Sequence, residues 1–414
     1  MVKVCKIRCY PNKTQIKKIN QIFGACRFVM NLYIEYNNTH DGFLSGYDFA
    51  KIITKLKKEE PEYEWLNDVS TKALKDAIMV QEKSYKNFFR RHKIGEKCSS
   101  PIFKSRKRLN KESFFFIKDN IHFNTGKKNI IKIPILKNIR ITERNYLPDK
   151  ESISSGRLIR EYDKYYIMFI YESKIHHIRN KQYGYGIDVG IKNYVTTYNT
   201  NEESYTFTHF KDSKRYQMLS KQIEDYQRII SKKAEINYGR LLNEYLDKHP
   251  GDELNETTKN IMKGESYNTS QIRKMRKKIV KLHQKKINIR KDFINKLVYL
   301  LVVRTKPEYI TMEDLSIKNM LEKDNNHDLH RYISESGLYY FRVHMINKSH
   351  EYETELRLAN RYFASSKKCS CCGHRLKSLT LSDRVYKCPN CGLEIDRDLN
   401  ASINLTYLKK YSIA

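Results

Sequence analysis

The alternation of hydrophobic and polar residues divides the N-terminal half of the chain into strand-like and helix-like segments. Residues 1–10 alternate in the run VKVCKIRCY, which predicts a short strand. Between residues 12 and 95, apolar residues recur at three- and four-residue spacing, which predicts a basic helical module opened by Asn12 or Thr14 as helix cap. Residues 113–172 alternate again and predict a small β-barrel or sheet. We expect the first strand to pair with this sheet, so that the helical module is an insertion in it.

The C-terminal half begins with a short apolar strand that carries Asp188, followed by a glycine turn and a second strand. The region 212–300 is mostly helical in pattern, with a charged, Asn-rich stretch at 233–270 that the pattern does not assign. A later strand ends at Glu313, and 337–360 predict a helix followed by a strand. The chain is therefore predicted to be an α+β multidomain protein.

The charge balance points to a polyanionic partner. Lys and Arg number 79 against 47 Asp and Glu, a formal net charge of +32. Nucleic acid is the commonest such partner, and an anionic membrane surface is the alternative. The chain has no run of about 18 apolar residues, and its N-terminus lacks the apolar segment of a secretory signal. We therefore expect a soluble, intracellular protein with no membrane partner. Its 31 Tyr and 17 Phe suit base stacking, although an AT-rich genome also favours Tyr codons.

Four cysteines form two pairs with identical spacing, Cys369-x2-Cys372 and Cys388-x2-Cys391. Each pair predicts a tight knuckle, and two knuckles on a hairpin can enclose a tetrahedral zinc ion. Gly373 and Gly392 follow the pairs and allow the positive φ that a knuckle needs. Free cysteines that are close by chance are the alternative. Cys371 and His374 do not fit the repeated spacing and are expected not to be ligands. The predicted zinc site has no open position and would be structural.

Three separated segments each bring a carboxylate to a strand end or to a helix start. Taken alone, each signal is weak: Asp188 could be a turn residue, and Asp396 and Asp398 could cap a helix. Together with Glu313 they would concentrate acid in a very basic protein, which requires a cation. Two Mg²⁺ ions about 4 Å apart could be held by such a site and would cleave a phosphodiester.

These residues carry a resemblance to a known family. GIDVG, then MEDL, then a four-cysteine segment ending in DRDLNASINL resembles the TnpB family, with softer support from CRFVMNLY and PIFKSRKR near the N-terminus. Members are nucleases encoded by insertion sequences, are related to the type V CRISPR effectors and are often labelled transposases. The resemblance covers nearly the whole chain except about 233–270, which looks like an insertion.

The resemblance implies an architecture. An RNase H-like (RuvC) α/β nuclease domain would contain an inserted zinc ribbon, and a small β-barrel wedge domain would contain a helical insertion. The implied boundaries are 1–11 and 98–182 for the wedge barrel, 12–97 for the helical recognition module, 183–366 and 394–414 for the nuclease domain, and 367–393 for the zinc ribbon.

The resemblance also implies a function. Asp188, Glu313 and Asp398 match the catalytic, magnesium-binding carboxylates, and Asp398 is preferred over Asp396 because it stands two residues before Asn-Ala. Zinc would be structural and Mg²⁺ catalytic. The partners would be a guide RNA derived from the transposon end and double-stranded target DNA with a short adjacent motif. The protein would act as a monomer in its RNA complex, and its cleavage of target DNA would support maintenance of the transposon.

Three other functions remain open at this level. A guided DNA-binding repressor would lack cleavage, although relatives of that kind lose carboxylates that are present here. A transposase could act directly in strand transfer, although no recombinase Tyr or Ser motif is evident. A zinc-ribbon nucleic-acid-binding protein would leave Asp188 and Glu313 unexplained. Copurifying RNA and a cleavage assay would distinguish these functions.

Overall fold

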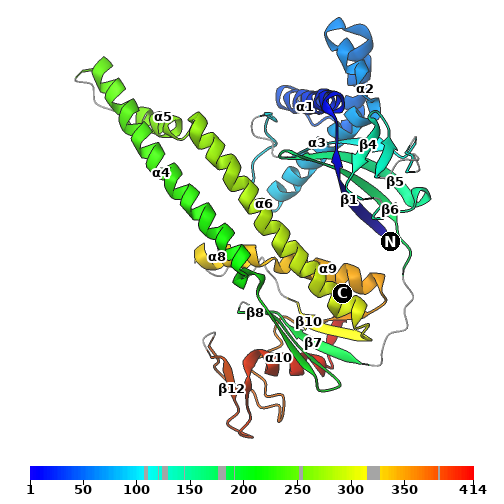
Figure 1. Cartoon of the computed structure of the whole chain (residues 1–414), viewed down its shortest axis with the longest axis vertical. Coiled ribbons are helices and arrows are strands. Elements are labelled where there is room, and N and C mark those ends of the chain that lie inside the picture. Colours follow the sequence, from blue (N-terminus) through cyan, green and yellow to red (C-terminus); the bar gives the residue numbers. More distant parts are fainter. Residues whose placement is uncertain are drawn as a thin grey trace. The chain divides into compact units, whose positions relative to one another are not determined.

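The computed structural model describes residues 1–106, 111–119, 121–123, 129–143, 145–175, 183–190, 192–250, 255–314, 327–380 and 383–414. The chain divides into two compact units, Met1–Lys174 and Ile175–Ala414 (Figure 1). Two expected features, the turn NTGKKN and the segment that follows MED, lie largely outside the described residues.

The first unit contains an antiparallel sheet of six strands in the order β2-β5-β6-β1-β4-β3. Its strands are β1 (Val2–Tyr10), β2 (Lys111–Ile117), β3 (Ile130–Ile133), β4 (Lys137–Ile141), β5 (Ile153–Glu161) and β6 (Lys164–Glu172). Strand β1 lies between β6 and β4, with Cys5 opposite Phe169, which confirms that the first strand pairs with the later ones. Every second side chain of β1 from Cys5 onward is buried, as the alternation predicted.

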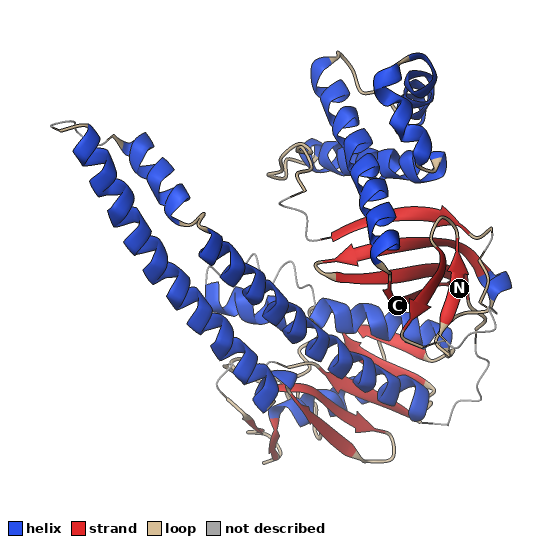
Figure 2. Cartoon of the chain, turned by 45° about the horizontal axis from the view of Figure 1, so that its top comes forward, coloured by secondary structure: helices blue, strands red, loops and turns tan. Residues whose placement is uncertain are grey.

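The helices of the first unit pack on this sheet (Figure 2). They are α1 (Lys13–Thr39), α2 (Gly46–Glu59) and α3 (Thr71–Lys93), with short 3₁₀ helices at Pro61–Asp68 and Lys150–Ser152. Asn12 caps α1 in a capping box with Gln15, which satisfies free backbone amides at the helix start. The Gln15 side chain also donates hydrogen bonds to the carbonyls of Leu136 and Asn138. Helices and sheet thus share one hydrophobic core.

The second unit contains a mixed sheet of six strands in the order β14-β11-β10-β7-β8-β9. Strands β7, β10 and β11 are parallel, and the other three run antiparallel to their neighbours. The strands are β7 (Gly184–Asp188), β8 (Asn193–Asn199), β9 (Ser204–Thr208), β10 (Tyr309–Glu313), β11 (Glu355–Ala359) and β14 (Tyr411–Ile413). The predicted strand that carries Asp188, which ends at that residue, and the predicted strand that ends at Glu313 are therefore direct neighbours.

The helices of the second unit lie on both faces of this sheet. They are α4 (Lys214–Lys248), α5 (Glu256–Ser266), α6 (Ser270–Val298), α8 (His327–Ser336), α9 (Leu338–Glu351) and α10 (Arg397–Thr406), with a 3₁₀ turn at Phe210–Asp212 and a π-helical turn, η4, at Tyr299–Arg304. Residues of α6, α9 and η4 form a core with Tyr185 and Ile187 of β7. Helix α10 packs on the opposite face, against Gly186.

The unassigned stretch 233–270 belongs to a helical hairpin. Helices α4 and α6 run side by side, and α5 completes the connection between them (Figure 1). Ile230 and Ala234 of α4 pack against Ile272 of α6. Next to this narrow apolar seam, α6 carries the run RKMRKK over 273–278. Met275 packs against the seam and the Lys and Arg side chains of the run are exposed, so this part of the hairpin is strongly basic.

Candidate metal sites

The sheet positions two of the predicted carboxylates on one face. In β7, Gly184, Gly186 and Asp188 share a face because strand side chains alternate. Gly186 faces α10, so Asp188 points to the same side as that helix. In β10, Tyr309 and Glu313 share a face, and the Tyr309 hydroxyl donates to the carbonyl of Thr406 in α10.

The register places these two carboxylates side by side. Tyr309 is opposite Gly184 and Met312 is opposite Ile187, so Asp188 and Glu313 are the next pair. Neighbouring strands lie about 4.8 Å apart. Both carboxylates therefore end parallel strands at the same edge of the sheet, where Asp188 also lies opposite Thr196 of β8 and Glu313 lies opposite Ala359 of β11.

Helix α10 brings Asp398 to this edge because Gly186 permits a very close approach. A Cβ atom at Gly186 would lie 2.3 Å from the carbonyl oxygen of Ser402 and 2.4 Å from the amide of Thr406. The Gly186 amide donates to the Thr406 hydroxyl at 2.8 Å. Asp398 is only 6% exposed. Its Oδ2 lies 3.9 Å from the position of a Cβ atom at Gly190, just beyond the end of β7.

The electrostatics show that the three carboxylates interact. The pKa of Asp188 is raised well above its usual value, first by burial and then by the negative charges of Glu313 and Asp398. Burial also raises the pKa of Glu313, which accepts a hydrogen bond from the Ser365 hydroxyl. The Arg397 guanidinium lies 3.4 Å from Asp398 Oδ1 and only partly offsets this negative charge. Such a cluster favours a bound cation.

The two aspartates of the DRD segment do different things. Asp396 is the N-cap of α10, and its side chain accepts hydrogen bonds from the amides of Asp398 and Leu399 at 2.9 and 3.0 Å. The capping expected of this segment is thereby confirmed for Asp396. Asp314, beside Glu313, forms ion pairs with Arg342 and Arg361 at 2.5 and 2.8 Å. The carboxylates of Asp396 and Asp314 are therefore already engaged in other interactions and are weaker candidates for binding a cation.

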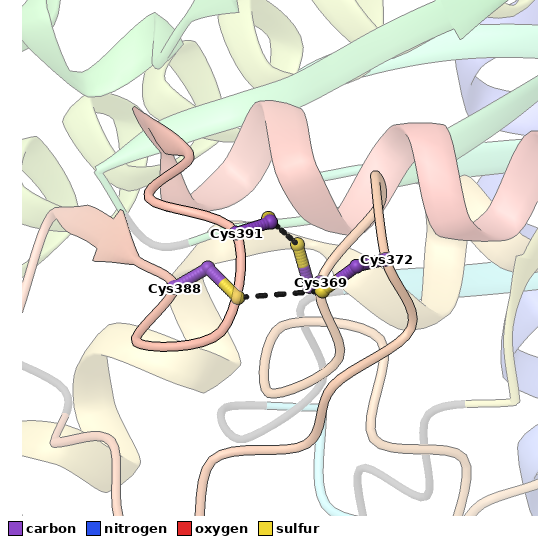
Figure 3. Close-up of side chains that lie close together, drawn as sticks. All are labelled: Cys369, Cys372, Cys388 and Cys391. Atoms are coloured by element: carbon purple, nitrogen blue, oxygen red, sulfur yellow. Dashed lines mark hydrogen bonds between the residues drawn. The ribbon is translucent and has the colours of Figure 1, made fainter.

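The four cysteines of the repeated pairs meet in two equivalent knuckles (Figure 3). In each knuckle the first cysteine amide donates to the carbonyl five residues later, and the glycine amide donates back to that cysteine's carbonyl. Gly373 and Gly392 have φ values of +77° and +73°, as the knuckle prediction requires. The hairpin of β12 (Val385–Lys387) and β13 (Glu394–Asp396) carries the second pair. Buried Tyr386 packs between the two knuckles.

The sulfur positions fit a tetrahedral metal ion. The Sγ atoms of Cys369 and Cys391 are 3.6 Å apart, those of Cys372 and Cys388 are 3.5 Å apart, and all four lie within 4.8 Å of one another. Four thiolates bound to zinc at about 2.3 Å would be about 3.8 Å apart, whereas a disulfide requires about 2.05 Å. The cluster is therefore a possible metal site and not a pair of disulfides.

The thiols share their negative charge unequally. Hydrogen bonds, first from the Asn390 side chain and then from the His374 backbone, lower the pKa of Cys372 to about 6. The pKa of Cys391 is raised to about 12, despite a hydrogen bond from the Leu393 backbone, by desolvation and by the neighbouring thiols. Four thiolates at this separation need a cation, since they cannot all ionise side by side.

Two asparagines to which the sequence analysis gave no role connect this cysteine cluster to α10. Asn400 and Asn404 lie one helical turn apart and both donate hydrogen bonds to the backbone beside Cys369. The available signal was the presence of two amides at i and i+4, on one face of a short helix.

The molecule is thus a two-unit α/β protein with an acidic sheet edge beside a four-cysteine hairpin. Known families match its two ends: the model of the "Cas12f1-like, TNB domain" matches residues 339–405, and a helix-turn-helix domain model of the IS605 OrfB type matches residues 1–40. The first match includes both cysteine pairs and all of α10 except its last residue.

Relatives match nearly the full chain. A Streptomyces pristinaespiralis protein named "Putative RNA-guided DNA endonuclease" is 26% identical over 97% of this chain and 87% of its own length. A "TnpB-like protein" from Acanthamoeba polyphaga mimivirus is 24% identical over 97% of this chain and 72% of its own length. These matches confirm the resemblance to the TnpB family.

One solved structure, a Cas12f1–sgRNA–target DNA complex, aligns with 98% of each chain at 14% identity and a TM-score of 0.45. This TM-score is too low for individual elements to be matched between the two structures. In the described part of the chain, no helix combines the length and apolar character that crossing a bilayer demands.

Proposed function

We propose that this protein is an RNA-guided, metal-dependent DNA endonuclease encoded by a transposable element. The observation that carries the proposal is the convergence of Asp188, Glu313 and Asp398 at one edge of the mixed sheet. The chain brings them together from two parallel strands and a helix start that are far apart in sequence. The names of the relatives, which describe RNA-guided DNA endonucleases and a TnpB-like protein, support the same function.

The three carboxylates would hold Mg²⁺, because hard cations prefer oxygen ligands and because the pKa of Asp188 is raised, first by burial and then by the negative charges of Glu313 and Asp398. Bound Mg²⁺ supplies Lewis-acid stabilisation of charge on phosphate oxygens and makes a water molecule more acidic. Asp188 and Glu313 are positioned by the sheet, and Asp398 by the capped helix start. The Ser365 hydroxyl orients the Glu313 carboxylate. Mixed-sheet topology with this acid edge supports an RNase H-like (RuvC) fold for the second unit.

Zinc would stabilise the cysteine hairpin rather than take part in chemistry, because all four ligands come from the protein. The expected ligands are Cys369, Cys372, Cys388 and Cys391. Cys371 lies outside this cluster, as expected because it does not fit the repeated spacing.

The nucleic-acid partners would be a guide RNA and double-stranded target DNA. The net charge of +32 and the basic face of α6 support extensive phosphate contacts. In the first unit, exposed Tyr47 lies under Lys51 and Lys75 at 4.8 and 4.4 Å, a combination of ring and cations that suits nucleic acid. We assign the sheet of this unit to a wedge domain, α1–α3 to a recognition module inserted in it, and residues 183–414 to the nuclease domain with its ribbon at 367–393.

The test is plasmid cleavage by the protein purified with its copurifying RNA, beside a target-binding assay. Asp188→Ala and Asp398→Ala should abolish cleavage and leave binding intact, since phosphate contacts lie elsewhere. Asp396→Ala is the matched control: it removes the helix cap, at a cost of about 1 kcal/mol in stability, and should retain most cleavage.

Each alternative outcome is informative. Unimpaired cleavage by Asp188→Ala would refute the proposed site. Full cleavage by Asp398→Ala together with loss in Asp396→Ala would exchange the roles of the two aspartates. RNA-dependent binding by the wild type without any cleavage would identify a guided repressor instead.

A further inference from the structure

The cysteine hairpin touches the nuclease helix at a second point besides the chain connection through β13. Asn400 of α10 is fully buried. Its Oδ1 accepts a hydrogen bond from the Ser370 amide at 2.9 Å, and its Nδ2 donates to the Lys368 carbonyl at 2.8 Å. Ser370 and Lys368 are the two neighbours of Cys369. Asn400 is therefore hydrogen-bonded to the backbone of the first knuckle on both sides of this cysteine.

Asn404, one helical turn after Asn400, adds two further hydrogen bonds to the same segment. Its Nδ2 donates to the Lys368 carbonyl at 2.7 Å and to the Ser365 carbonyl at 2.9 Å. Ser365 is buried, and its hydroxyl donates to Glu313. A continuous set of hydrogen bonds thus runs from the first knuckle through α10 to Ser365 and Glu313.

We propose that Asn400 and Asn404 are positioning residues that lock the first cysteine knuckle onto α10 and thereby hold Asp398 and Glu313 at a fixed separation. The inference rests on the proposed nuclease function for its catalytic consequence. Its structural content, a link between the cysteine cluster and the acidic edge, does not depend on cleavage.

The physical reason lies in the like charges of the acidic edge. Carboxylates that must converge on a cation repel one another before it binds, so they need a rigid support. Helix α10 has only ten residues, too few to be stable without tertiary contacts. Its N-terminus is held by Asp396, and Asn400 and Asn404 hold its middle to the hairpin. Without them, α10 could shift along β7 and carry Asp398 away from Glu313.

The experiment compares Asn400→Ala and Asn404→Ala with Ser402→Ala as matched control. Ser402 is on the same helix and equally buried, but its hydroxyl donates only to Leu399 within α10. Cleavage by the RNA-loaded protein is measured against Mg²⁺ concentration. A lost hydrogen bond changes an equilibrium by about fivefold, and each asparagine side chain makes two such bonds. Each asparagine variant should therefore need about five- to 25-fold more Mg²⁺ for half-maximal rate. Saturating Mg²⁺ should restore most of the maximal rate, and Ser402→Ala should behave like the wild type.

A second readout does not use activity. Mn²⁺, which also prefers oxygen ligands, is titrated calorimetrically into the zinc-loaded protein. The asparagine variants should bind it several-fold more weakly while retaining full zinc content and a cooperative unfolding transition. Asn404 is partly exposed, so Asn404→Ala tests the idea if Asn400→Ala fails to fold.

The outcomes separate this inference from the proposed function. If the wild type does not cleave, the function fails, and the Mn²⁺ titration still decides the link. Unchanged Mg²⁺ requirement and Mn²⁺ affinity in both asparagine variants would overturn the inference. Loss of zinc from these variants would also overturn it, because the asparagines would then support the cysteine cluster alone.

Discussion

Gly186→Ala tests whether the close packing of α10 on β7 sets the position of Asp398. The added Cβ atom would lie 2.3 Å from the Ser402 carbonyl oxygen and 2.8 Å from the Leu405 carbonyl carbon, whereas ordinary contact begins near 3.4 Å. These are backbone atoms of a helix, so no single side chain can move to make room. Helix α10 must move away by about 1 Å, the difference between 3.4 and 2.3 Å.

The cost of this movement has two parts. Overpacking in a close-packed interior costs about 1–3 kcal/mol, and loss of the hydrogen bond from the Gly186 amide to Thr406 adds about 1 kcal/mol. We therefore expect a loss of about 2–4 kcal/mol in the free energy of unfolding of the second unit. Displacing a catalytic carboxylate by about 1 Å should lower the cleavage rate by about 100-fold.

Denaturant unfolding and cleavage at saturating Mg²⁺ measure the two effects, with Gly239→Ala as control. Gly239 is in helix α4 and has no atom within 4 Å of its would-be Cβ, so the same substitution there should stabilise by about 0.5–1 kcal/mol. Wild-type stability and cleavage in Gly186→Ala would show that α10 does not set the geometry of the acidic edge.

Three further predictions concern metals, pH and salt. Because the folded protein raises the pKa of Asp188, the Mg²⁺-free wild type should lose stability as pH rises from about 4 through that raised value. Asp188→Asn should reduce this loss, which thermal unfolding without added Mg²⁺ would detect, and the part that remains reflects the raised pKa of Glu313. Addition of Mg²⁺ should then stabilise the wild type but not the variant, and equal stabilisation of both would contradict this. Elemental analysis should find about one zinc per chain, and less than half of that in a Cys388→Ser, Cys391→Ser double variant; full zinc in the variant would exclude the cluster. Guide-RNA affinity should fall steeply with salt, because each phosphate contact releases roughly 0.7–0.9 counterion; a flat log–log plot would mean that the positive charge faces another partner.

The sequence was most informative where the spacing of residues along the chain directly determines the local geometry. The two x2 cysteine pairs, each followed by glycine, predicted two knuckles, and both form with the same hydrogen bonds. Local rules also predicted Asn12 as a helix cap and the alternation of β1. Such features depend on residues that are close in the chain, so a single sequence contains the information they need.

The sequence was less informative where two nearby residues compete for one role. Preference for Asp398 over Asp396 came from the family resemblance and not from the residue types. In the structure, the Asp396 carboxylate is committed to the amides of Asp398 and Leu399. Asp398 lies two residues further on, in the first turn of α10, and faces the sheet. The two aspartates have different roles because α10 begins at Arg397, which makes Asp396 the N-cap. Helix propensities do not locate the end of a helix to a single residue.

The hairpin at 233–270 shows a different limit. Its apolar seam is narrow and its remaining surface is charged, so the sequence pattern does not separate a long helix from a solvated linker. The packing of α4 against α6 stabilises both helices, and this packing is not visible in the sequence pattern of either helix alone.

By itself, the sequence determined the strongly basic character of the chain, the cysteine knuckles, and the strands that carry Asp188 and Glu313. Only the tertiary structure decided that β7 and β10 are neighbours, that α10 lies against Gly186, and that Asn400 and Asn404 join the hairpin to α10. The physical reason is that strand order and helix docking depend on the burial of surfaces contributed by segments more than a hundred residues apart. A local sequence pattern predicts that a strand or helix has an apolar face, but not which other element packs against that face.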